Sequence, residues 1–250
     1  MCELLGFSSA HETDIRKYLK IFFSHGIHNP HGWGLMRENY GITEIIKEAV
    51  SSAESQKIPE IIAETSPQRI ALAHIRLATV GSIKIENCHP YIQKDYSGRC
   101  WTLIHNGTIY SGKQLMKYLY TQTGDTDSER ISLALIDEIN EKKPKTAKQR
   151  FDVVDDFVIS LSKRNKLNLM IYDGELLYVH QNMRDTLYCK SENDGIVFST
   201  KSLDNGNWKP YPMTQLCAFH AGEKVFEGTK HEHIFVPALD YITEMDAMHI

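Results

Sequence analysis

Cys2 directly follows Met1, and this position gives its thiol an unusual chemical opportunity. Removal of Met1 would place a free α-amino group, with an ordinary pKa of about 7.7–8.0, beside the thiol. Such an amine can act as the general base for its own nucleophile. Position alone leaves two ordinary explanations open, because a residue near a terminus can be tolerated without function and a free cysteine packs as a small apolar residue.

Two internal segments carry groups that could bind or stabilise a negative charge. Arg76 lies in the apolar stretch 73–77, where a guanidinium could bind a carboxylate through two parallel hydrogen bonds. Thr79 could add a hydroxyl group. Asn106-Gly107 follows a predicted strand and is typical of a hairpin turn, but the Asn106 amide and the Gly107 N–H could also form an oxyanion hole.

Two further segments have both a structural and a functional interpretation. Asp127 lies in the first turn of a predicted helix, where the helix dipole stabilises a carboxylate, and it could equally hold a substrate ammonium group. The segment His31-Gly32-Trp33-Gly34 places two glycines around a tryptophan at the start of a strand. This pattern indicates either an ordinary turn or a close approach of two backbones.

The elements that must position these groups follow from the hydrophobic periodicity. Strands are predicted at residues 2–9, 33–37, 42–47, 70–77, 101–105, 167–172, 175–180, 187–190, 196–200, 216–220 and 224–227. Helices are predicted at residues 15–23, 112–123, 126–142 and 147–163. Asn39-Tyr40-Gly41 and Asp173-Gly174 predict hairpins, and Thr126 with Glu129 predicts a capping box. This order favours antiparallel sheets layered with helices.

Composition excludes several classes of protein. The 250 residues are 42% hydrophobic and 24% charged, as in an ordinary globular protein, and the net charge of −4 argues against a nucleic-acid partner. No apolar run is long enough to cross a membrane, and we see no signal peptide. Five scattered cysteines without a CxxC pair favour a reducing compartment, hence the cytoplasm. The histidines in the loop 25–31 share no predicted helical face, so no metal site is expected.

Together, and in this order, the segments resemble the class II glutamine amidotransferase domain of the N-terminal nucleophile hydrolase superfamily. The resemblance is strongest to the small stand-alone members of the YafJ-like type. The matching motifs are Cys2-Glu3-Leu4-Leu5-Gly6, His31-Gly32-Trp33-Gly34, Ala73-His74-Ile75-Arg76, Asn87-Cys88-His89-Pro90-Tyr91, His105-Asn106-Gly107 and Thr126-Asp127-Ser128-Glu129. The family fold implies one domain over residues 2–250, an α+β four-layer α/β/β/α sandwich of two antiparallel sheets.

The resemblance also implies a reaction. It assigns catalysis to Cys2, Asn106 and Gly107, and substrate binding to Arg76, Thr79 and Asp127. The Cys2 thiolate would attack the γ-carbonyl of glutamine, release ammonia, and form a γ-glutamyl thioester that water hydrolyses. No cofactor is expected. His31 and Val80 depart from the residues that are common in the family.

Two other functions stay open at this point. One is a γ-glutamyl hydrolase that acts on a γ-glutamyl peptide or thiol conjugate, and the other is a non-catalytic module that binds glutamine for regulation. The presence of all five residues Cys2, Arg76, Asn106, Gly107 and Asp127 argues against the second. Transfer of the ammonia would need an acceptor site, and we expect a partner synthase to supply it. The apolar residues of the stretch 231–250 predict packing or an interface.

Overall fold

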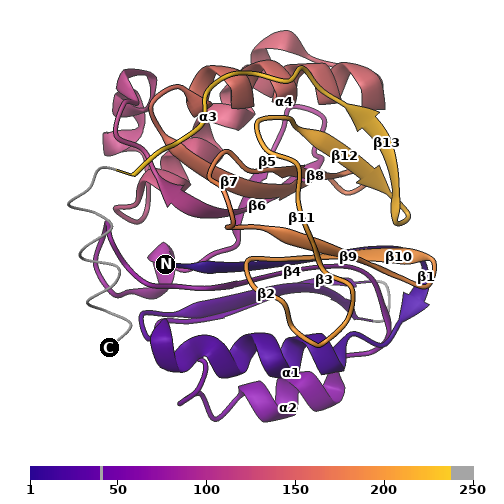
Figure 1. Ribbon diagram of the computed structural model, residues 1–250. Helices are drawn as coiled ribbons and strands as arrows, with labels where there is room; N and C mark the ends of the chain where they lie inside the picture. Colours follow the sequence, from indigo (N-terminus) through magenta and orange to yellow (C-terminus); the bar gives the residue numbers. More distant parts are fainter. Residues whose placement is uncertain (40–41, 238–250) are drawn as a thin grey trace.

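Two antiparallel sheets lie face to face between two layers of helices in the computed structural model, which describes residues 1–39 and 42–237 (Figure 1). The first sheet has the order β11 (Lys209–Pro210), β9 (Tyr188–Glu192), β10 (Gly195–Ser199), β1 (Glu3–Thr13), β4 (Gln68–Ile75), β2 (Trp33–Asn39), β3 (Ile42–Glu48). The second has the order β13 (Glu223–Glu227), β12 (Cys217–His220), β8 (Leu177–His180), β7 (Lys166–Tyr172), β6 (Cys100–Thr108), β5 (Tyr91–Lys94). The predicted α/β/β/α sandwich is therefore confirmed.

The helices cover the outer faces of the two sheets. The first sheet is covered by α1 (Arg16–Ser24) and α2 (Ile58–Glu64), and the second by α3 (Asp127–Lys142) and α4 (Ala147–Ser162) (Figure 1). Short 3₁₀ helices are η1 (His25–His28), η2 (Ile85–Asn87) and η3 (Lys113–Tyr120). The α-helix predicted at 112–123 is thus a 3₁₀ helix, and α2, β5 and β11 were not predicted from the sequence.

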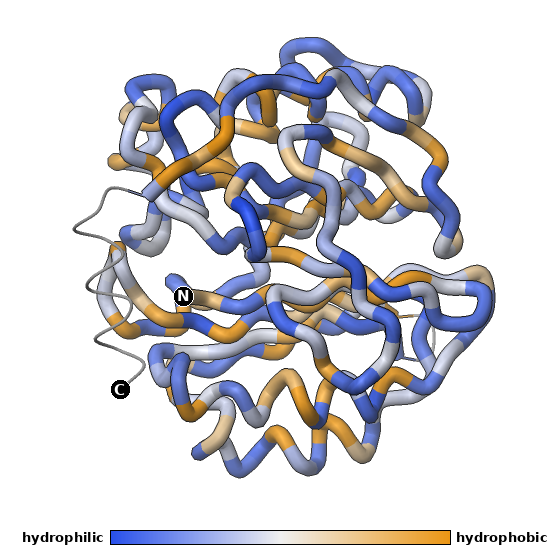
Figure 2. Tube along the Cα trace, viewed as in Figure 1, coloured by the Kyte–Doolittle hydropathy of each residue, from blue (hydrophilic) through white to orange (hydrophobic). Residues whose placement is uncertain are grey.

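Residue alternation along the strands produces three apolar cores, because successive strand side chains point to opposite faces of a sheet. Leu5 and Phe7 of β1 pack toward α1, whereas Leu4 lies in the core between the sheets. In β7, Leu169 packs toward the helices α3 and α4, and Met170 lies between the sheets. Apolar segments accordingly lie along the strands and the inner faces of the helices (Figure 2).

The two predicted hairpins form, and one of them has a longer turn than predicted. Asn39 pairs with Ile42 in the β2–β3 hairpin, whose predicted turn residues 40–41 lie outside the described residues. In the β7–β8 hairpin, Tyr172 pairs with Leu177, so the connection spans residues 173–176 instead of two residues. The Asp173 carboxylate explains the difference, because its Oδ1 accepts hydrogen bonds from the N–H groups of two residues of this turn.

The start of α3 confirms half of the predicted capping box. Thr126 Oγ1 accepts a hydrogen bond from the Glu129 N–H at 3.2 Å. The Glu129 carboxylate does not return to Thr126, and instead it accepts hydrogen bonds from the N–H groups of Thr123 and Gly124 at 2.6 and 2.7 Å. Glu129 therefore closes the turn before the helix, where it satisfies two donors that would otherwise need water.

The chain after β13 returns over the second sheet. The His231 N–H donates to the Thr214 carbonyl and the Phe235 N–H donates to the Asn182 carbonyl. The Phe235 ring stacks on Tyr110 with the ring centroids 5.6 Å apart. The packing predicted for this stretch is seen for Phe235, whereas Ile234 and Val236 are exposed, and residues 238–250 lie outside the described part.

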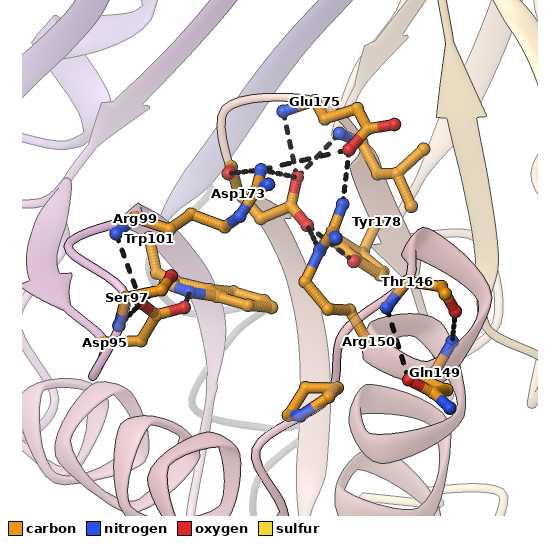
Figure 3. Close-up of polar contacts among 12 residues, drawn as sticks. Asp95, Ser97, Arg99, Trp101, Thr146, Gln149, Arg150, Asp173, Glu175 and Tyr178 are labelled. Atoms are coloured by element: carbon orange, nitrogen blue, oxygen red, sulfur yellow. Dashed lines mark hydrogen bonds and ion pairs between the residues drawn. The ribbon is translucent and has the colours of Figure 1, made fainter.

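A buried ion network fastens α4 to the β7–β8 turn (Figure 3). Asp173 is fully buried, and its Oδ2 accepts hydrogen bonds from Arg150 Nε at 2.7 Å and from the Tyr178 hydroxyl at 2.9 Å. Arg150 also pairs with Glu175 through its second nitrogen. Because the Asp173 carboxylate is shielded from water, these fixed donors must stabilise its negative charge in place of solvent.

Truncation of Arg150 should strongly destabilise the fold. Arg150→Ala removes the nearer cation of the buried Asp173 carboxylate and leaves Arg99, whose Nη1 lies 3.9 Å from Asp173 Oδ1, and we expect the free energy of unfolding to fall by about 3–5 kcal/mol in urea denaturation. Lys148→Ala is the matched control on the same helix, because Lys148 pairs with Asp152 on the surface, with both side chains more than half exposed. The control should lose less than about 0.5 kcal/mol. Equal losses in the two variants would contradict this account of the network.

Candidate active site

The polar residues of the candidate site share the faces of the strands that look into the core between the sheets. Leu4 and Ile104 lie in this core, so Cys2 and Asn106, each two residues away, are placed toward the same space. In β7, Lys166 lies four residues before Met170, so the same alternation places both side chains on the face toward this core. The apolar core between the sheets therefore ends in a group of polar side chains, at the edge where the N-terminus lies (Figure 1).

The Cys2 thiol lies against the peptide that follows β4. Glu3 pairs with Ile75 in the β1–β4 ladder, and Cys2 Sγ consequently lies 3.3 Å from both the N and the O of Leu77. Burial raises the pKa of the thiol, whereas the N–H of Leu77 and the nearby positive charges of the terminal amine, Lys166 and Arg76 lower it. The thiol is thus held in a fixed position within a cationic environment.

The side-chain amide of Asn106 is buried, and only one of its two ends has a hydrogen-bond partner among the described residues. Its Oδ1 accepts a hydrogen bond from Lys166 Nζ at 3.2 Å, while its Nδ2 is buried and has no partner among the described residues. A buried donor without a partner is costly, and native structures contain few of them. Next to it, a Cβ on Gly107 would lie 2.0 Å from the Lys166 carbonyl oxygen, so only glycine fits at this close approach of β6 and β7.

Arg76 is buried, and its guanidinium holds the loop that follows it. Its two terminal nitrogens donate to the carbonyls of Val80, Gly81 and Ser82 at 2.9, 3.1 and 3.0 Å, and more weakly to the His31 carbonyl at 3.5 Å. Thr79 is exposed in the same loop. The sequence predicted that Arg76 binds a carboxylate, and in the structure most of its donors meet backbone carbonyls instead.

Asp127 begins α3 and is buried beside the end of β6. Its Oδ2 accepts a hydrogen bond from the Ile109 N–H at 2.8 Å, which ties the helix to the segment after Asn106-Gly107. The neighbouring Asp125 accepts hydrogen bonds from the N–H and hydroxyl groups of Ser82. The start of α3 therefore connects the predicted oxyanion segment with the loop that Arg76 holds.

Residues 31–34 pack tightly against the site, which favours the close backbone approach over the ordinary turn, the two alternatives that the sequence left open. The Ala78 N–H donates to His31 Nδ1 at 2.9 Å, and the Arg76 N–H donates to the Gly32 carbonyl at 2.7 Å. Burial and, secondly, the Arg76 charge lower the pKa of His31, which keeps its ring neutral and able to accept this bond. A Cβ on Gly34 would lie 1.9 Å from the His89 carbonyl oxygen.

Three buried histidines surround the site and are neutral. Burial lowers the pKa of His74 to about 3 and holds those of His89 and His105 below their ordinary value. The His74 and His89 rings lie 4.0 Å apart, and His105 Nδ1 lies 2.9 Å from the Ser128 hydroxyl. In the part of the chain that the structure describes, no group of three or more His, Cys, Asp or Glu side chains is arranged to hold a metal ion.

Lys166 is the residue at this site that the sequence reasoning missed. It directly precedes the predicted strand 167–172, where a lysine normally marks the solvent-exposed end of a strand. In the structure it is the first residue of β7 and only 2% exposed. The one available signal was the four-residue spacing from Met170, an even number that places the two side chains on the same face of the strand.

A comparison with models of known protein families identifies the family of the chain. Residues 1–192 match the family model of class-II glutamine amidotransferases. The chain belongs to the class II glutamine amidotransferases. This amidotransferase is 28% identical to YafJ of Escherichia coli, in an alignment that covers 72% of each chain. It is also 25% identical to an uncharacterized protein of Methanocaldococcus jannaschii, over 98% of this chain and 76% of that protein.

Solved structures with the same fold include a chain that is covered completely and longer chains of which only half is covered. A predicted glutamine amidotransferase from Pseudomonas aeruginosa superposes with a TM-score of 0.66 at 21% identity, over 90% of this chain and 100% of that one. Glutamine phosphoribosylpyrophosphate amidotransferase from B. subtilis gives a TM-score of 0.69 at 16% identity, over 93% of this chain and 50% of that one. At these identities the likeness concerns the fold. In the described part of this amidotransferase, no helix is long and apolar enough to cross a membrane.

The close approach at Gly34 should be sensitive to a single methyl group. Gly34→Ala places a Cβ against the backbone of His89, which cannot move away without displacing the site, and we expect a loss of about 1–3 kcal/mol in the free energy of unfolding. Gly6→Ala is the matched control in a buried strand, because its Cβ meets the flexible thioether of Met170. Urea denaturation should show a clearly smaller loss for the control, and the reverse order would refute the tight approach.

Proposed function

We propose that this class II glutamine amidotransferase hydrolyses the γ-amide of glutamine, with Cys2 as its N-terminal nucleophile after removal of Met1. One observation carries the proposal. The thiol of Cys2 and the unpartnered Nδ2 of Asn106 belong to the same face of the core between the sheets. Lys166 lies beside both, because its Nζ lies 3.2 Å from Asn106 Oδ1 and its positive charge acts on the Cys2 thiol.

The reaction uses one nucleophile, one base and one oxyanion hole. The free α-amine of Cys2 takes the thiol proton, and the thiolate adds to the γ-carbonyl carbon of glutamine. Asn106 Nδ2 and the Gly107 N–H stabilise the oxyanion of the tetrahedral intermediate. The C–N bond then breaks, the amine returns the proton to the departing ammonia, and a γ-glutamyl thioester remains. Water attacks the thioester and releases glutamate and the free thiol.

The two charged groups of glutamine need two charged partners. Arg76 is the proposed partner of the α-carboxylate, with the Thr79 hydroxyl as a further donor, and Asp127 is the proposed partner of the α-ammonium group. Because the Arg76 donors now meet the carbonyls of Val80, Gly81 and Ser82, carboxylate binding would exchange some of these hydrogen bonds. A charged acceptor competes well with neutral carbonyls for a guanidinium.

A catalytic thiol needs a compartment that keeps it reduced. The five cysteines are free in the structure, and we place the reaction in a reducing compartment such as the cytoplasm. A partner synthase is the proposed acceptor of the ammonia, and the hydrolysis itself can be measured without it.

Loss of the thiol should abolish the reaction. For protein shown by mass spectrometry to lack Met1, we expect Cys2→Ala to reduce the release of glutamate and ammonia from L-glutamine to background, because no thioester can form. Cys100→Ala, which removes an exposed free thiol outside the site, should retain wild-type activity. Wild-type protein that lacks Met1 and releases no ammonia would refute glutamine as the substrate, and turnover of a γ-glutamyl peptide in the same assay would identify a γ-glutamyl hydrolase.

Exchange of the guanidinium should affect substrate binding more than chemistry. Arg76→Lys keeps the positive charge but removes the planar pair of donors, and we expect KM for L-glutamine to rise at least about tenfold with a smaller change in kcat. Steady-state kinetics on folded protein provide the measurement, with Arg69→Lys as a control at an exposed arginine of β4, the strand that precedes Arg76. An unchanged KM in Arg76→Lys would mean that Arg76 serves only to hold its own loop.

A further inference from the structure

Lys166 is a buried cation, and a contribution to the stability of the fold does not explain why it is buried. Its side chain is only 2% exposed at the start of β7. Among the described residues, Nζ contacts Asn106 Oδ1 and Met1 Sδ, and no carboxylate forms an ion pair with it. Fully buried lysines are rare unless they are paired, because removal of an ammonium group from water is costly. Burial accordingly lowers the pKa of Lys166 to about 8.

A purely structural role does not account for this side chain. Lysines in apolar surroundings usually bury their methylene groups and extend the ammonium to water. Here the ammonium itself is enclosed, at the end of the same face that carries Asn168 and Met170. An apolar side chain of similar length would fill the space without the cost of desolvation. The position of the Nζ atom and its contacts therefore need a functional explanation.

The contact with Asn106 fixes the direction of an amide. An ammonium group has three donors and no acceptor, so Lys166 can pair with Asn106 only through Oδ1. The opposite rotation of the amide would place Nδ2 against Nζ, where two donors repel each other. With Oδ1 occupied, Nδ2 is held facing the side on which no described residue is its partner. The charge also polarises the amide, which strengthens Nδ2 as a hydrogen-bond donor.

The same charge acts on the nucleophile. The groups that face the Cys2 thiol are the terminal amine, Lys166 and Arg76, and all three favour the thiolate. Burial is the main cause that lowers the pKa of the Met1 amine in the structure; the charges of Lys166 and Lys201 lower it further, and Cys2 and Glu3 raise it. After removal of Met1, we expect the Lys166 charge to act in the same direction on the α-amine of Cys2. A lower pKa increases the neutral fraction of an amine near pH 7, and only the neutral amine can accept the thiol proton.

We propose that Lys166 is a positioning residue of the amidotransferase reaction, whose ammonium group holds the Asn106 side chain with its N–H donors toward the developing oxyanion and keeps a positive charge beside the Cys2 thiol. The proposal rests on the proposed function, because it assigns the oxyanion to Asn106. It goes beyond that function by naming a third residue, from the other side of the β6–β7 ladder, on which both catalytic groups depend.

The decisive variant is Lys166→Met, which keeps the length of the side chain and removes the donors and the charge. With L-glutamine and protein free of Met1, we expect kcat to fall about 10- to 100-fold with KM within about twofold, as for the loss of a charged hydrogen bond used in the transition state. Asn106→Ala should lower kcat about 10²–10³-fold. In the double variant, the loss of kcat should be clearly smaller than the product of the two single losses, because Lys166 acts in part through Asn106.

Stability measurements separate positioning from packing. Lys166→Met should unfold at an unchanged or higher urea concentration, because it removes an unpaired buried charge. Leu169→Ala is the matched control in the same strand, since Leu169 is fully buried on the face toward the helices. The control should unfold at a lower urea concentration and retain kcat. Wild-type kcat in Lys166→Met, or full multiplication of the two losses in the double variant, would overturn the proposal.

A second measurement does not depend on glutamine turnover. The rate of Cys2 alkylation by iodoacetamide, followed by mass spectrometry against pH, reports the thiolate directly. The midpoint of this profile should move to higher pH in Lys166→Met, while that of the exposed Cys100 should not move. If wild-type protein fails to hydrolyse glutamine but the Cys2 midpoint moves, the proposed substrate is wrong and the Lys166 charge still acts on the nucleophile. An unmoved midpoint together with unchanged kinetics rejects the proposal.

Discussion

The pairing of the first residues of β1 with the last residues of β4 is the constraint on which the site depends. Glu3 lies opposite Ile75, and this register brings Cys2 beside the peptide of Leu77 and next to Arg76. A slip of one residue would turn Cys2 toward the helical layer, because strand side chains alternate between the two faces of the sheet. Glu3 reinforces the register from that opposite face through a hydrogen bond with His25 and an ion pair with Lys201.

The electrostatic character of the site follows from unequal burial of its titratable groups. Three enclosed histidines are neutral at physiological pH, because burial lowers their pKa. Arg76 keeps its charge, since a guanidinium does not deprotonate in proteins. The site therefore joins a permanent cation and the Lys166 ammonium to a set of neutral rings. Such an arrangement favours anionic groups, namely a thiolate, a carboxylate and an oxyanion.

Features that depend on local periodicity could be predicted from the sequence. The alternation in β1, β4 and β6 predicted strands, and the resemblance of the motifs predicted the sandwich and the family, which the comparison confirmed. Features that depend on distant partners were missed. The 3₁₀ helix η3 has the same apolar spacing as an α-helix, and the Glu129 carboxylate found donors before the helix instead of at its cap.

Lys166 shows most clearly why the site could be predicted only in part. The spacing from Met170 indicates only the face on which Lys166 lies and not its burial, because the residues that contact its ammonium come from β6 and the N-terminus. The burial of the Lys166 ammonium, and of an Asn106 Nδ2 that has no partner among the described residues, is unfavourable for folding. The surrounding ladders and three apolar cores must offset that cost, and they also fix both groups in place. The rigidity of the sandwich and the energetic cost of its site are thus two consequences of the same packing.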